Sequence, residues 1–242
     1  MTIRLNKFLA QAGVASRREA DRMILNGEIK VDGRVVQEMG AKIDEARARV
    51  EVRGRPVVRE DRLVYLAFYK PKGVLVTFKD PLGRPTIMSL LPKLRQRVFP
   101  VGRLDFDSEG LLILTNDGEL ALRLAHPRYE VKKKYIVEVD GLPGPDALYR
   151  LETGIMLDGE RTAPAKAKLM AGTPRHSRLL IEVHEGRKHE VRRMCEAVGH
   201  RVRALKRISF AGLMLGSLKP GQWRFLDAKE VGKLKTPSGG IH

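Results

Sequence analysis

Apolar residues in the first sixty positions recur first at helical spacing and then at strand spacing. Four of them share one helical face ahead of Gly13, a residue typical of helix ends, and these are Leu5, Phe8, Leu9 and Ala12. Residues 16–19 (Ser-Arg-Arg-Glu) have the form of a capping box, which predicts that a second helix begins there. Alternating apolar residues on either side of Asp32-Gly33 predict a β-hairpin. The pattern predicts a small domain of two helices and a β-hairpin over residues 1–60.

The longer segment that follows contains short apolar runs separated by turn residues. These runs predict strands over residues 63–69, 75–78, 111–115, 135–139 and 179–183. One helix is predicted over residues 119–125, and another from four apolar residues on one face, which are Val191, Met194, Cys195 and Val198. Strands and helices are mixed without strict β-α-β alternation. We therefore expect an α+β fold with a mostly antiparallel mixed sheet flanked by helices.

Two polar stretches set the expected boundaries of the larger domain. Residues 54–62 (GRPVVREDR) are polar and predict a linker. Residues 233–242 include Pro, Ser and two Gly near the end of the chain, which predicts a flexible tail. The larger domain is accordingly expected over residues 61–232.

The charge of the chain indicates what it binds. It carries 46 Lys and Arg against 29 Asp and Glu, a formal net charge of +17. Such an excess favours a polyanionic partner, because each neutralised phosphate releases a counterion; the alternative is a solvated surface without a specific partner. In the small domain, the predicted helices and hairpin would present a basic face made of Arg17, Arg18, Arg22 and Lys30.

Several classes of protein are not supported by the sequence. The single cysteine, Cys195, excludes an intramolecular disulfide and thiolate clusters, and its place on an apolar helix face predicts a buried side chain. The six histidines show no metal-binding spacing, and neither a phosphate loop nor a serine-hydrolase elbow is present. No apolar run reaches the ~18 residues that cross a bilayer, and residues 1–12 lack a cleavable signal pattern. We expect a cytoplasmic protein that uses no metal and contacts no membrane.

Residues 101–110 combine three acids and an arginine in a segment bounded by glycines, just before a predicted strand. Acids held in a loop by a sheet are candidates for catalysis, although most such acids are solvated or cap helices. From chemistry alone Asp105 and Asp107 cannot be ranked. Tyr135 shares a strand face with Val137 and Val139, so it is either a core side chain or a stacking surface for a base.

Residues 184–208 carry eight Lys or Arg against three Glu, a density that suits phosphate contact. On the predicted helix in this segment, Arg192 lies at the flank of the apolar face and Arg193 points toward solvent.

Taken together, these segments resemble the ribosomal RNA pseudouridine synthases that carry an N-terminal RNA-binding domain of the ribosomal-protein S-four type. Residues 4–9, 16–18 and 31–33 resemble the small domain. Further segments resemble the catalytic core and the later motifs of the family. They are Lys70-Pro71-Lys72-Gly73, Gly102-Arg103-Leu104-Asp105, Gly110-Leu111-Leu112, residues 115–118, Lys134-Tyr135 and residues 185–194. Residues 80–86 and 91–95 are more similar to members acting on large-subunit RNA. One departure is His189-Glu190, where relatives often have a glutamine.

The resemblance implies specific roles. Asp105 would be the catalytic carboxylate in a reaction in which uracil detaches, rotates and rejoins through carbon, with no cofactor. Tyr135 would stack on the extruded uracil, Arg192 would pair with Asp105, and Arg103 would hold the opened RNA. Other basic residues would contact the RNA, namely Arg17, Arg18, Lys132, Lys133, Lys134 and Arg193.

Rival functions remain open at this point. A non-catalytic ribosomal RNA-binding or assembly factor would use the same basic surfaces, and the same chemistry on small-subunit or transfer RNA would use the same motifs. A DNA-binding regulator is disfavoured, because no recognition helix is paired with a dimerisation segment. The expected partner is ribosomal RNA or an assembling ribosomal subunit, and we expect a monomer.

Overall fold

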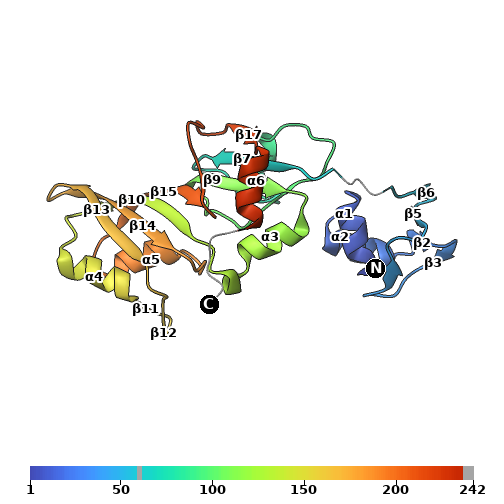
Figure 1. Ribbon diagram of the computed structural model, residues 1–242, viewed down its shortest axis with the longest axis horizontal. Helices are drawn as coiled ribbons and strands as arrows, with labels where there is room; N and C mark the ends of the chain where they lie inside the picture. The colour runs from blue at the N-terminus through green and yellow to red at the C-terminus, as the bar shows by residue number, and fades with distance from the viewer. Residues whose placement is uncertain (59–61, 237–242) are drawn as a thin grey trace. The chain divides into compact units, whose positions relative to one another are not determined.

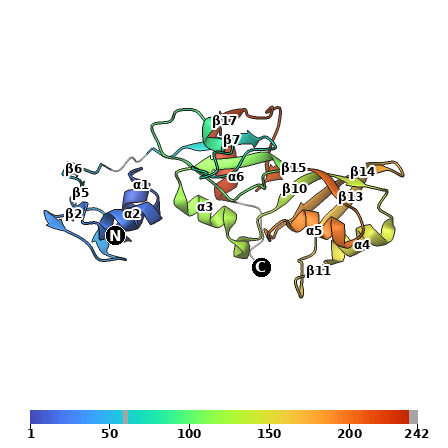
Figure 2. The same ribbon diagram turned by 180° about the vertical axis from the view of Figure 1, so that it is seen from behind.

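The computed structural model describes residues 1–58 and 62–236. The chain divides into two compact units (Figures 1 and 2). The N-terminal unit contains residues 1–64 with 94–98 and 116–118, and the C-terminal unit contains the remainder. The domain boundary expected at residue 60 stays a prediction, since residues 59–61 of the predicted linker lie outside the described residues.

The N-terminal unit is built from two short helices and two small sheets. Its elements are β1 (Thr2–Arg4), α1 (Leu5–Gln11), α2 (Arg17–Leu25), β2 (Ile29–Val31), β3 (Arg34–Val35), β4 (Lys42–Asp44), β5 (Val50–Val52) and β6 (Arg55–Pro56). β1 pairs with β4, and the second sheet has the order β3-β2-β5-β6. Helices and sheets share one core that includes the fully buried Leu5, Leu9, Ala20 and Ile29.

Local chemistry explains where these elements begin and turn. Ser16 caps α2 by accepting a hydrogen bond from the Glu19 N–H at 3.2 Å, while the Glu19 carboxylate pairs with Arg22 at 2.6 Å. The hairpin between β2 and β3 turns at Asp32 and Gly33, which both have positive φ. Positive φ at both central residues is what a type I′ turn requires, which confirms the predicted hairpin. The two predicted helices are confirmed as α1 and α2.

The C-terminal unit is an α+β structure around one large sheet. Its elements are β7 (Tyr65–Lys70), a 3₁₀ turn (Ile87–Ser89), β8 (Phe99–Pro100), β9 (Glu109–Thr115), α3 (Gly118–Ala125), a 3₁₀ turn (Pro127–Tyr129), β10 (Lys133–Asp140), α4 (Pro145–Thr153), β11 (Met156–Leu157), β12 (Glu160–Arg161), β13 (Lys166–Gly172), β14 (His176–Val183), α5 (Glu190–Ala197), β15 (Val202–Phe210), β16 (Leu213–Met214), β17 (Trp223–Phe225) and α6 (Ala228–Lys235). The sheet has the order β13-β14-β10-β15-β9-β7-β17, with β16 beside β15 and β8 beside β9. The expected fold class, a mostly antiparallel mixed sheet flanked by helices, is confirmed.

Two hydrophobic clusters attach helices to this sheet. One packs α4 and α5 on β10, β14 and β15, and the other packs α3 and α6 beside β7 and β9 (Figure 1). The predicted face of α5 is confirmed: Val191, Met194 and Cys195 are buried in the first cluster. No helix in the described part of the chain is long and apolar enough to span a membrane.

The two halves of the sheet meet where β9 runs parallel to β15, with Gly110 opposite Arg207. Gly110 has a φ of +112°, and a Cβ added there would lie 2.3 Å from the Arg207 carbonyl oxygen. No side chain fits in that space. The approach of the two strands therefore depends on a glycine at position 110.

Two expectations from the sequence are wrong. Residues 75–78 form no strand, and Leu75 makes only an isolated bridge with Thr86. This run instead closes a loop, because Leu75 and Ile87 are linked by a backbone hydrogen bond of 2.9 Å and Ile87 is fully buried.

The second error concerns the predicted tail. Residues 233–235 belong to α6, whose Leu234 is fully buried. A capping box starts this helix: Asp227 accepts from the Glu230 N–H at 2.8 Å, and Glu230 accepts from the Asp227 N–H at 3.1 Å. Residues 237–242 of that predicted tail lie outside the described residues.

Candidate active site

The loop that carries Asp105 is held by a buried lysine. Lys70, at the end of β7, is fully buried, and its ammonium donates to the carbonyl oxygens of Pro71, Phe106 and Ser108 at 3.0, 3.5 and 2.7 Å. Burial lowers the pKa of Lys70 to about 8, against the opposing effect of the neighbouring Asp105, Asp107 and Glu109 carboxylates. These hydrogen bonds fix the backbone on both sides of the loop and leave the Asp105 side chain 38% exposed.

Asp105 lies at a cavity of about 360 Å³ in the C-terminal unit. The cavity is also lined by residues of β10, β15, α5 and the loop before α5, among them Tyr135, Leu205 and Val191. Arg103 and Lys133 also line the cavity. A carboxylate beside an aromatic ring and aliphatic side chains provides a site for a flat, partly apolar ring such as a nucleobase.

Tyr135 is 8% exposed and belongs to the cluster under α5, while it also lines the cavity. The core interpretation is therefore confirmed, and stacking on a base stays a prediction. On the same strand, Lys133 donates to the carbonyl oxygen of Glu185 at 2.6 Å, and Lys134 pairs with Glu182 at 3.2 Å.

The expected pairing of Arg192 with Asp105 is wrong. Arg192 forms its ion pair with Asp107 at 2.9 Å and lies within hydrogen-bond distance of the Ser108 hydroxyl at 3.4 Å. Its other terminal guanidinium nitrogen donates to the Val202 carbonyl oxygen at 3.4 Å, so Arg192 links the loop to β15. Asp105 instead faces His189, whose Nε2 lies 3.5 Å from the carboxylate oxygen Oδ1.

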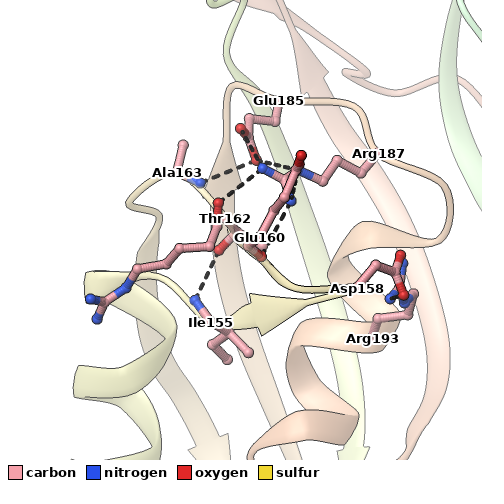
Figure 3. A network of polar contacts seen from close by, with 9 residues as sticks. Ile155, Asp158, Glu160, Thr162, Ala163, Glu185, Arg187 and Arg193 are labelled. Atoms are coloured by element: carbon pink, nitrogen blue, oxygen red, sulfur yellow. Dashed lines mark hydrogen bonds and ion pairs between the residues drawn. The ribbon is translucent and has the colours of Figure 1, made fainter.

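The loop before α5 is tied to the β11–β12 hairpin by a polar network (Figure 3). Glu185 accepts from the Ala163 N–H at 3.1 Å and pairs with Arg187 at 3.2 Å, while Arg187 donates to the Arg161 carbonyl oxygen at 2.9 Å. Arg193 pairs with Asp158 at the hairpin turn, 2.6 Å away. The network fixes the wall of the cavity that carries His189.

Glu190 is an acid buried beneath this loop. Its side chain is 6% exposed, and burial raises its pKa to about 7, with a further rise from the hydrogen bond and charge of Glu185. Lys133 lies close enough to oppose that rise, and its own pKa is lowered to about 8 by burial and by the positive charge of Arg207. The residues that line the cavity therefore include two ionisable groups, Glu190 and Lys133, whose pKa values lie near neutral pH.

Glu190 makes the stability of the protein depend on pH. Between its ordinary pKa of 4.5 and the folded value of about 7, the unfolded chain releases a proton that the folded chain keeps. Wild-type protein should therefore lose stability as pH rises through this window. Glu190→Gln cannot ionise at this position. The free energy of unfolding of this variant, relative to that of wild type, should therefore rise by roughly 1–3 kcal/mol from pH 4.5 to pH 7.

Urea unfolding at several pH values would measure this difference. Glu196→Gln, an exposed glutamate on the same helix, is the control and should follow the wild-type curve. If Glu190→Gln and wild type run parallel from pH 4.5 to 7, Glu190 is not protonated in the folded state.

The remaining residues predicted to contact RNA are distributed over the surface. Arg17 and Arg18 are exposed in the first turn of α2, and Lys132 is exposed before β10. The cavity residues that were given no individual role from the sequence include His189, Glu190 and Arg207. His189-Glu190 stood out only as a departure from relatives, and Arg207 was hidden among the basic residues of 184–208.

Comparison with known proteins identifies the family to which the chain belongs. Residues 64–197 match the family described as RNA pseudouridylate synthase, and residues 3–45 match the S4 domain. The chain is 46% identical to ribosomal large subunit pseudouridine synthase B of Bacillus subtilis, over 96% of this chain and 95% of that protein. It is 45% identical to an uncharacterized RNA pseudouridine synthase of Aquifex aeolicus, over 97% and 94% of the two chains.

A solved structure supports the same assignment. A crystal structure of a pseudouridylate synthase superposes with a TM-score of 0.70 at 28% identity, and the match covers 96% of this chain and 99% of that one. The cavity with Asp105 and Tyr135 lies in the unit that contains the matched catalytic segment. This chain therefore belongs to the RNA pseudouridylate synthase family, with an S4 domain at its N-terminus.

Proposed function

We propose that this enzyme isomerises one specific uridine of large-subunit ribosomal RNA and that Asp105 is its catalytic carboxylate. The observation that carries the proposal is the place of Asp105, partly exposed at a cavity whose other walls include Tyr135 and aliphatic side chains. The choice of large-subunit RNA is supported by the 46% identity to the Bacillus subtilis enzyme named for that subunit.

The geometry of the cavity supports this chemistry. A uridine in folded RNA must be flipped out before a carboxylate can reach its glycosidic bond. Tyr135 would stack on the extruded uracil, and Arg103, two residues before Asp105, would hold the opened RNA. Asp105 acts at the bond between ribose and base, the uracil turns within the cavity, and it rejoins through C5. The isomerisation has no net redox change and transfers no group, so it needs no cofactor.

Basic side chains of both units would position the RNA backbone. Those proposed are Arg17, Arg18, Lys132, Lys133, Lys134 and Arg193. Three of them have intramolecular partners: Lys133 with Glu185, Lys134 with Glu182 and Arg193 with Asp158. Of the six, the exposed Arg17, Arg18 and Lys132 are the most accessible to a phosphate.

Mapping of pseudouridine in treated RNA tests the proposed target. Transcripts of large- and small-subunit ribosomal RNA, and isolated ribosomal particles, would be incubated with the enzyme and then probed by carbodiimide labelling and primer extension. We expect one new stop, in the large-subunit RNA, either free or in the particle. A stop confined to small-subunit RNA would refute the target and retain the chemistry. Binding without any stop would favour an assembly factor.

A further inference from the structure

Arg207 is a buried cation at the cavity, and the proposed mechanism assigns it no role. Arg207 lies in β15, is 2% exposed and lines the same cavity as Asp105. Its Nε donates to the Leu111 carbonyl oxygen at 2.8 Å, and its guanidinium carbon lies 4.8 Å from the centre of the Phe210 ring. These two contacts hold the guanidinium in one orientation.

One guanidinium nitrogen of Arg207 has no acceptor in the part of the chain that the structure describes. Nη2 is buried and makes no hydrogen bond within the described residues. Leaving a charged donor buried and unpaired destabilises a fold, so such a group in a cavity points to a ligand that supplies the acceptor. The neighbouring cation differs in this respect, because Lys133 already donates to the Glu185 carbonyl oxygen at 2.6 Å.

The sheet register places Arg207 beside the residue proposed to stack on the base. Arg207 and Tyr135 are directly opposed on the antiparallel strands β15 and β10. Directly opposed residues project from the same face of a sheet, with Cβ atoms about 5 Å apart. A base stacked on the Tyr135 ring would therefore have one edge next to the Arg207 guanidinium.

We propose that Arg207 donates a hydrogen bond to a carbonyl oxygen of the extruded uracil. This inference rests on the proposed function. Uracil offers two such oxygens, O2 and O4, whereas a backbone phosphate would stay nearer the surface than a side chain that is 2% exposed. The acceptor that completes Arg207 is therefore assigned to the base.

The proposed contact is useful at each stage of the isomerisation. The bond between C1′ and N1 breaks with its electron pair on the uracil, whose negative charge spreads onto O2 and O4. A fixed cationic donor stabilises that charge. Half a turn about the axis through N3 and C6 exchanges N1 with C5 and O2 with O4. The new bond then joins C1′ to C5, the C5 proton passes to a base such as the Asp105 carboxylate, and N1 gains a proton from water. Arg207 stays protonated and faces a carbonyl oxygen before and after the turn.

A double-mutant cycle tests this contact by combining a substitution in the enzyme with a sulfur substitution in the RNA. The substrates are short RNAs around the uridine that wild type modifies, carrying uridine, 2-thiouridine or 4-thiouridine at that position. Sulfur accepts hydrogen bonds poorly. We expect Arg207→Met to lower the single-turnover rate on uridine about a hundredfold. At least one thio-substitution should slow wild type, and it should slow Arg207→Met much less.

The outcomes separate this inference from others. If both thio-substitutions slow wild type and Arg207→Met by equal factors, Arg207 does not contact a carbonyl oxygen and the inference fails. Thermal unfolding checks that Arg207→Met is folded. If Arg207→Met is unfolded, Arg207→Lys, which keeps the charge, is used for a second cycle. Arg224→Met, on the far edge strand and paired with Glu230, should keep the wild-type rate and thio-sensitivity. A wild-type enzyme that modifies no RNA would refute the proposed function itself.

Discussion

Replacing Asp105 with asparagine should lower the single-turnover rate of pseudouridine formation by at least about a thousandfold. The amide has nearly the same shape as the carboxylate, but it can act neither as a nucleophile nor as a proton acceptor at neutral pH. The fold should be retained, because the side chain is 38% exposed and its one ion-pair partner in the described part of the chain is His189, at 3.5 Å. Rapid-quench measurement of pseudouridine with saturating enzyme would give the rate.

Asp107→Asn is the matched control, since it makes the same change two residues away. Asp107 loses part of its ion pair with Arg192, yet Arg192 keeps the Val202 carbonyl oxygen as an acceptor and stays near the Ser108 hydroxyl. We expect its rate to stay within about tenfold of wild type. If Asp107→Asn were inactive and Asp105→Asn active, the two carboxylates would have exchanged the roles proposed for them.

Replacing Gly110 with alanine should lower the free energy of unfolding by roughly 3–5 kcal/mol. Two costs combine. The added Cβ would lie 2.3 Å from the Arg207 carbonyl oxygen and 2.6 Å from its nitrogen, so β9 and β15 must separate. The φ of +112° is also one that an alanine rarely adopts. Urea unfolding followed by the fluorescence of Trp223, the only tryptophan in the chain, would measure the loss in the C-terminal unit.

Gly216→Ala separates the two costs. Gly216 also has a positive φ, +62°, but nothing lies within 4 Å of the position that a Cβ would occupy. Its loss should be about 1–2 kcal/mol, from backbone conformation alone. Equal losses at positions 110 and 216 would mean that the strands yield to the extra methyl group and that Gly110 is required only for its φ.

Local signals in the sequence were enough to predict four helices, α1, α2, α3 and α5, and the strands β2, β3, β7, β9, β10 and β14, but not the remaining elements. The Ser16 cap, the Asp32-Gly33 turn and the apolar face of α5 each depend on residues within one or two turns of chain, where side-chain chemistry acts directly on the backbone. The run at residues 75–78 has the same apolar character as a strand. It becomes a loop because its hydrogen-bond partners are Pro85 and Ile87.

What the sequence could not predict depends on contacts between distant segments. The three carbonyl oxygens that surround the Lys70 ammonium and the parallel pairing of Gly110 with Arg207 arise only when separate strands meet. The partner of Arg192 is decided by the path of the loop around Asp105, which turns Asp107 toward α5. Resemblance to a family supplied the proposed catalytic role of Asp105, and geometry was needed to find its neighbour, His189.

The order of strands in the large sheet also bears on how the enzyme is made on the ribosome. β7 is the first strand of that unit to be synthesised, and it lies between β9 and β17, with Phe68 opposite Trp223. One edge of β7 must therefore wait unpaired until translation has passed residue 225, whereas the N-terminal core is complete by residue 57. The S4 domain can finish folding while the catalytic unit is still being synthesised. The RNA-binding domain of the chain therefore forms before its catalytic unit does.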